Sequence, residues 1–180
     1  IKWTPEMDDL SPVTLMDGWS QPEPLPGLIN SAGGEDSPFI TPDGETFFFF
    51  FTPDVTVPAE GQLYDGATGI WWSQYDVIWS VPQRIVLNDA PGLDGCPCAL
   101  GNRLWFCSVR VGNYGEIDFY VADLVNGSWR NWQNAGQRLN GDLSIGELHM
   151  LTEELMYFHW NGEGGYGNVD IWSMEHTGSD

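Results

Sequence analysis

The chain alternates short runs of apolar and aromatic residues with clusters of Gly, Pro, Asn and Asp. Residues 47–51 and 104–106 are typical runs. The 22 Gly and 12 Pro residues are spread along the whole length, so that almost no segment keeps the 3.6-residue periodicity of an amphipathic helix. Short runs of this composition, bounded by turn residues, are typical of β-strands. The pattern predicts an all-β protein.

The runs recur with a period of about 50 to 60 residues, the range of propellers and other repeat folds. In each unit a Trp precedes an apolar residue that is followed by Asn, at Asn30, Asn88 and Asn140. An acidic residue then opens a strand-like run, and a turn and an aromatic strand follow. The acidic residues that we place at equivalent positions are Glu35, Asp94 and Glu147.

The sharpest repeat is the segment 114–120, Tyr-Gly-Glu-Ile-Asp-Phe-Tyr, which returns at 166–172 as Tyr-Gly-Asn-Val-Asp-Ile-Trp. Each unit reads as four short strands separated by turns, which is one β-propeller blade. We therefore predict a β-propeller repeat domain over residues 18–180, after an N-terminal arm of residues 1–17. Its three four-stranded antiparallel blades cover residues 35–88, 94–140 and 146–176.

The last unit is one strand short, and residues 18–29 match the fourth strands of the other two units. We expect this N-terminal strand to complete the last blade. Three blades fall below the four to eight of known propellers, so we predict a homodimer with a six-bladed ring. Two alternatives stay open: the chain is a fragment, or a degenerate blade lies within residues 1–17 and 52–68.

Residues 37–44, Ser-Pro-Phe-Ile-Thr-Pro-Asp-Gly, and residues 164–172 resemble the WD-like propeller repeats of TolB-type and related bacterial envelope proteins. The resemblance spans about residues 18–176. It implies a scaffold for protein or glycan contacts in the periplasm or outside the cell, and it carries over no catalytic residue. The turns at 101–102 and 152–154 depart from the family by lacking Pro-Asp-Gly.

The formal charge of −20 comes from 6 Lys and Arg against 26 Asp and Glu. A field of this sign repels phosphate and anionic lipid, which disfavours nucleic-acid and membrane partners. No run of 18 apolar residues exists, and the N-terminus has no signal-peptide pattern, so we expect no membrane span. Because the sequence begins with Ile1 and not Met, we expect a processed or trimmed product. The charge suits solubility or cation binding.

The repeated acids Glu35, Asp94 and Glu147 stand at the entrance of the innermost predicted strands, where they could gather at one mouth of a central channel. Such a ring could bind calcium. It is also similar to the acidic sets of five-bladed glycosidases, whose chemistry needs two separated carboxyl groups. The competing interpretation is structural, because an acid repeated in every blade usually serves each blade.

Three further sets of residues carry expectations of their own. Glu147 and His149 are two apart on a predicted strand and share a face, as a metal-ligand pair, an acid–base pair or a structural pair. Trp160, surrounded by Asn and Gly, is the Trp that we expect to be exposed for binding. Asp118 and Asp170 are expected to stabilise the turns that precede them.

The three cysteines, Cys96, Cys98 and Cys107, are too few for a disulfide scaffold and lack zinc-site spacing. A two-residue turn at Gly101 and Asn102 pairs strand positions whose numbers sum to 203, which places Cys96 opposite Cys107. We expect the two to be neighbours, with a disulfide if the protein is exported.

These observations favour a non-enzymatic binding module that presents loops to a glycan or protein ligand. One alternative is a glycosidase-like hydrolase that uses the channel carboxylates. Another is a structural repeat segment of a larger envelope protein. Fold alone does not decide among them.

Overall fold

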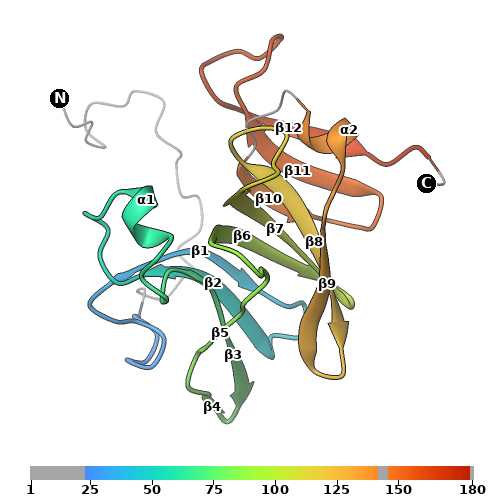
Figure 1. Ribbon diagram of the computed structural model, residues 1–180. Helices are drawn as coiled ribbons and strands as arrows, with labels where there is room; N and C mark the ends of the chain where they lie inside the picture. Colours follow the sequence, from blue (N-terminus) through green and yellow to red (C-terminus); the bar gives the residue numbers. More distant parts are fainter. Residues whose placement is uncertain (1–22, 142–145, 179–180) are drawn as a thin grey trace, which may run out of the picture.

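The computed structural model describes residues 23–141 and 146–178, and these residues form an all-β structure. Strands far outnumber helices among the described residues and form three separate antiparallel sheets (Figure 1). The two helices, α1 (Ala59–Gln62) and α2 (Gln137–Asn140), have four residues each. The predicted all-β class is confirmed.

The three sheets follow one another along the chain. The first sheet contains β1 (Gly34–Ile40), β2 (Thr46–Thr52), β3 (Gly69–Asp76), β4 (Ile78–Trp79) and β5 (Gln83–Arg84). The middle sheet contains β6 (Gly92–Leu100), β7 (Arg103–Arg110), β8 (Asp118–Val125) and β9 (Ser128–Asn134). The last sheet contains β10 (Gly146–Met150), β11 (Leu155–Trp160) and β12 (Asp170–Glu175). Each sheet is built from antiparallel neighbours, as local turns favour.

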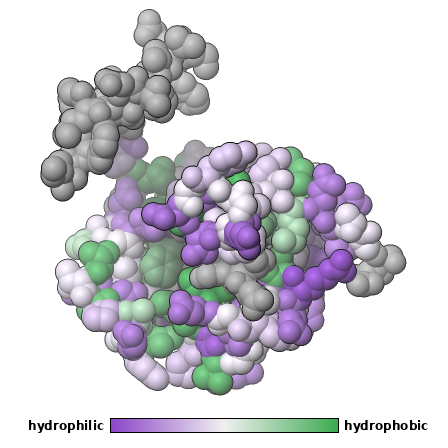
Figure 2. Space-filling view, turned by 90° about the horizontal axis from the view of Figure 1, so that it is seen from above, coloured by the Kyte–Doolittle hydropathy of each residue, from purple (hydrophilic) through white to green (hydrophobic). Residues whose placement is uncertain are grey.

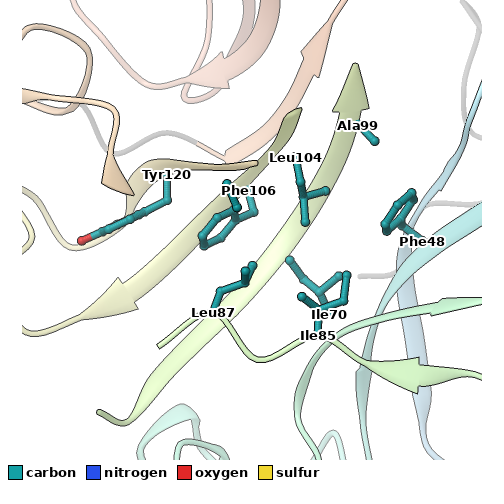
Figure 3. Close-up of a cluster of buried hydrophobic side chains, with 9 residues drawn as sticks. Phe48, Ile70, Ile85, Leu87, Ala99, Leu104, Phe106 and Tyr120 are labelled. Carbon is teal, nitrogen blue, oxygen red and sulfur yellow. The ribbon is translucent and has the colours of Figure 1, made fainter. Parts of the chain in front are cut away.

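The middle sheet lies between the other two and packs against both (Figure 1). Figure 3 shows the first of these two interfaces, where side chains from the first sheet meet side chains from the middle sheet. Its buried members are Phe48, Ile70, Ile85, Leu87, Ala99, Leu104, Phe106, Tyr120 and Ala122. The second interface buries Cys98, Cys107, Phe119, Leu139, Leu148, Met150 and Phe158. Burial of this apolar area, at about 25 cal/mol per Å², is the main stabilising contribution.

Equivalent strand positions face the preceding sheet in both the middle and the last sheet. In the middle sheet Leu104 and Phe106 face the first sheet, and in the last sheet Met156 and Phe158 face the middle sheet. In the first sheet, the strand registers place Phe47 and Phe49 at the positions equivalent to these residues. Within the described residues no further sheet covers that face.

The outer strand of the last sheet differs from the prediction. Residues 23–29, the described part of the expected strand 18–29, form no strand, and residues 27–29 form a turn. The rest of that segment, with the arm 1–17, lies outside the described residues. In the part of the chain that the structure describes, the last sheet therefore has three strands.

The repeated local signals have clear structural roles. Ile29, Leu87 and Leu139, which precede the repeated Asn residues, are buried. Asp118 accepts hydrogen bonds from the N–H groups of Tyr114 and Gly115 at 2.8 and 3.0 Å. Asp170 accepts the equivalent bonds from Tyr166 and Gly167 at 2.7 and 3.0 Å. The predicted turn-stabilising roles of both aspartates are confirmed.

Candidate functional site

Each sheet begins with a strand that carries one β-bulge. The ladder register shifts between Asp36 and Phe39 in β1, between Gly95 and Cys98 in β6, and between Gly146 and His149 in β10. At each shift one non-glycine residue is left-handed, with φ of 49° at Ser37, 50° at Cys96 and 49° at Glu147. Such residues are uncommon and strained, and they concentrate at functional sites.

The three bulges bring their left-handed residues together. The Ser37 hydroxyl donates a hydrogen bond to Glu147 Oε1 at 3.1 Å, and the Cys96 thiol donates to the same oxygen at 3.7 Å. The three side chains come from three different sheets and are far apart in the sequence. We call Ser37, Cys96 and Glu147 the bulge triad.

The bulge triad lines two adjoining pockets. The first, of about 150 Å³, is bounded by the three bulges and contains Phe39 and His149. The second, of about 220 Å³, lies on the other side of Cys96 and extends to Asp94 and Cys107. Both are smaller than the pockets of about 300 to 1,000 Å³ that hold drug-sized ligands. They suit a single side chain or a similarly small group.

The thiols of Cys96 and Cys107 lie side by side, but not in the predicted register. Cys98 pairs with Trp105 and Leu100 with Arg103, as expected from the turn at Gly101, but Cys107 pairs with Gly95. The bulge adds one residue and moves Cys96 out of the ladder, so the prediction that Cys96 and Cys107 are strand partners is wrong by one position. All three cysteines are free.

The pKa of Cys96 depends on the thiol next to it. The Cys107 thiol beside it lowers the pKa of Cys96, and the Ser37 hydroxyl acts in the same direction, whereas burial and the Glu147 carboxylate oppose them. The net pKa of Cys96 is lowered. The pKa of Cys107 is raised well above its ordinary value because it shares that contact and is buried. Cys96 is thus the group of the pair that ionises first.

The predicted equivalence of the three acids is wrong. The bulges align Glu147 with Ser37 and Cys96, while Glu35 and Asp94 come two residues before their bulges. The Pro residues that follow Ser37 and Cys96 align the first two units, but the third unit has Leu148 at that position, so the sequence carries no equivalent signal at Glu147. The sequence interpretation therefore missed both of these residues as partners of Glu147.

Glu35 and Asp94 have separate structural partners. Glu35 accepts hydrogen bonds from the backbone and hydroxyl of Ser31 at 3.0 and 2.5 Å. Asp94 forms a buried ion pair with Arg110, with both side chains 6% exposed. The Arg110 guanidinium also stacks 4.3 Å from the ring centre of Tyr120. Among the described residues, the three acids do not form a group that could hold a metal ion.

The remaining predicted site residues divide between pocket and core. His149 is exposed in the first pocket, with its ring 6.1 Å from that of Phe39. Trp160, expected to be exposed, is half-buried against Trp172 with the ring centres 5.0 Å apart, and it does not line either pocket. Glu147 and His149 are thus the two predicted residues that share the first pocket.

Among the described residues, no group of three or more His, Cys, Asp or Glu side chains has an arrangement suited to a metal ion. The same part of the chain contains no helix of the length and hydrophobicity that crossing a membrane requires. No protein-family model matches the sequence, and no curated protein is similar to it. The geometry of the site therefore carries the functional argument.

Proposed function

We propose that the chain is a non-enzymatic binding module built of three propeller blades, with the bulge triad at the axis of the ring. The proposed ligand is a protein partner that inserts a basic side chain into the pocket. The convergence of Ser37, Cys96 and Glu147 from three sheets supports this most directly. Their first strands then correspond to the inner strands of the blades.

The chemistry of the pocket favours a cation over an anion. Glu147 is exposed and supplies a carboxylate, and the Ser37 hydroxyl can accept a further hydrogen bond. The overall charge of −20 steers basic partners towards the surface. The volume of about 150 Å³ suits one inserted side chain. Figure 2 shows one face of the molecule, with hydrophilic and hydrophobic residues interspersed on it.

The carboxylates offer little support for the rival hydrolase. Glycoside hydrolysis needs two carboxyl groups with different protonation states on either side of the scissile bond. Asp94 is buried in its ion pair with Arg110, and Glu35 accepts hydrogen bonds from Ser31. Glu147 is the one of the three that lines the first pocket, and in the second pocket Glu147 and Asp94 both occur, with Asp94 held in its ion pair with Arg110.

We also propose that a second copy of the chain completes the ring. The face of the last sheet that carries Tyr157 and Ile171 corresponds to the faces by which the other two sheets pack onto their neighbours. Ile171 is 78% exposed there. On the first sheet, Phe47 and Trp79 are both half-buried and pack against each other, with the ring centres 5.8 Å apart. The repeated packing therefore continues from the last sheet of one copy to the first sheet of the other.

A titration followed by NMR tests the ligand, with hexalysine and the neutral sugar cellohexaose as probes. We expect hexalysine to shift the resonances of Ser37 and Cys96. Glu147→Gln should weaken its binding about tenfold, or about 1.4 kcal/mol. The matched variant Glu153→Gln removes the same charge from an exposed turn and should change affinity less than about twofold.

Equal effects of the two variants would contradict a pocket for basic side chains. Shifts of the same resonances by cellohexaose alone would show a glycan site instead. Hydrolysis of cellohexaose that is lost in Glu147→Gln would replace the proposal with the hydrolase.

A further inference from the structure

Cys96 and Cys107 are a pair of thiols with different surroundings. Cys96 is half-buried and lines both pockets, where its thiol contacts Glu147. Cys107 is 4% exposed and borders only the second pocket, behind Cys96. A small reagent that enters the first pocket therefore meets Cys96 and not Cys107.

The third cysteine has a different role. Cys98 is fully buried in the interface between the middle and last sheets. Its Sγ accepts a hydrogen bond from the Met150 N–H at 3.2 Å, which ties the two sheets together. Cys98 lines neither pocket. It is thus an internal control for the chemistry of the other two.

The β-bulge lets the two thiols meet. Gly95 is the Cα partner of Cys107, and facing residues of an antiparallel pair lie about 4.5 to 5.5 Å apart. Cys96 follows Gly95 as the extra residue of the bulge. The distance between the Cα atoms of Cys96 and Cys107 is therefore close to the range of about 4.4 to 6.8 Å that a disulfide spans.

We propose that Cys96 and Cys107 form a redox-active dithiol, in which Cys96 is the nucleophile and Cys107 the resolving thiol. The co-reactant is a low-molecular-weight disulfide. The proposal for these thiols does not depend on which ligand the pocket binds.

The reaction proceeds in two exchanges. The Cys96 thiolate attacks one sulfur of the small disulfide, its S–S bond breaks, and the first small thiolate leaves and takes up a proton. Cys107 then loses its proton and attacks Cys96 Sγ, which releases the second small thiol. The protein loses two electrons and two protons, and the small disulfide is reduced to two thiols.

The lowered pKa of Cys96 supports this order of events, because the thiolate is the attacking species. Cys107, with its raised pKa, remains protonated until Cys96 has reacted. Formation of the bridge removes the thiol hydrogen that Cys96 donates to Glu147. Oxidation therefore alters the bulge triad directly.

The test uses the reduced full chain, oxidised glutathione and peptide mapping by mass spectrometry. We expect a Cys96–Cys107 disulfide to form in the folded protein while Cys98 stays a thiol. Cys107→Ala should stop the reaction at a glutathione adduct on Cys96. Cys98→Ala should leave the bridge unchanged.

A second measurement does not depend on the variants folding. Iodoacetamide should alkylate Cys96 of the folded native chain at least about tenfold faster than Cys98 or Cys107. Equal rates at the three thiols, or a bridge that forms only after unfolding in urea, would overturn the proposal.

Discussion

At the residue scale, the same sequence signal has different physical meanings in different sheets. Glu35 and Asp94 occupy equivalent positions, yet Glu35 bonds to exposed Ser31 and Asp94 forms a buried ion pair with Arg110. Arg110 also bonds to the Leu87 carbonyl and the Ser108 hydroxyl. The environment, and not the repeat, determines what each carboxylate does.

This difference predicts unequal costs for equivalent substitutions. Asp94→Asn removes the charge that compensates Arg110, and breaking a buried ion pair in this way costs about 3 to 5 kcal/mol of unfolding free energy. Glu35→Gln at the equivalent position should cost less than about 1 kcal/mol. Urea denaturation of both variants measures the difference. Similar losses would show that the buried pair is not what distinguishes Asp94.

At the element scale, the strands could be predicted but the bulges could not. The turn at Gly101 is set by local chemistry, so the pairing of Leu100 with Arg103 and of Cys98 with Trp105 follows from the sequence. A bulge adds one residue to one strand and shifts the pairing beyond it, and the turn signals do not specify where this occurs. The predicted strand partner of Cys96 and the predicted repeat position of Glu147 were therefore wrong, although the strands that contain both residues were predicted correctly.

The left-handed bulge residues give a second prediction. Ser37→Gly relieves backbone strain of about 1 to 2 kcal/mol. It also raises the entropy of the unfolded chain, at a cost of about 0.5 to 1 kcal/mol, and removes the hydroxyl that bonds to Glu147, at a cost of about 0.5 to 1.5 kcal/mol. These contributions nearly cancel, so the free energy of unfolding should change by about 1 kcal/mol or less. Ile40→Gly, in the same strand but with ordinary extended backbone, should cost about 1 to 2 kcal/mol. Thermal and urea unfolding compare the two. A larger loss for Ser37→Gly would contradict the bulge in β1.

At the scale of the whole molecule, the three sheets pack one after another along the chain. The outer face of the first sheet and the outer face of the last sheet differ from each other. The sequence predicted the three units because each repeats its own strands and turns. It did not reveal which faces pack together, because this depends on the register of every strand. The exposed Ile171 on one end face and the half-buried Phe47 and Trp79 on the other are the residues that a second copy would bury further.

This arrangement predicts an effect of charge on assembly. Ile171→Glu places a carboxylate at the proposed contact and should convert dimers into monomers without changing the circular dichroism spectrum. Val111→Glu is the matched control, because Val111 is 97% exposed in the loop after β7. It should leave the dimer intact. Dissociation by both variants would show that added charge alone, and not the end face, controls assembly.

We propose that the three sheets are half of a ring, with the bulge triad at its axis. Sedimentation equilibrium across a wide dilution range tests it most directly, since the chain mass is 20.1 kDa. We predict a particle of twice that mass at the higher concentrations, with dissociation only on dilution. A mass of 20.1 kDa at every concentration would contradict the two-chain ring.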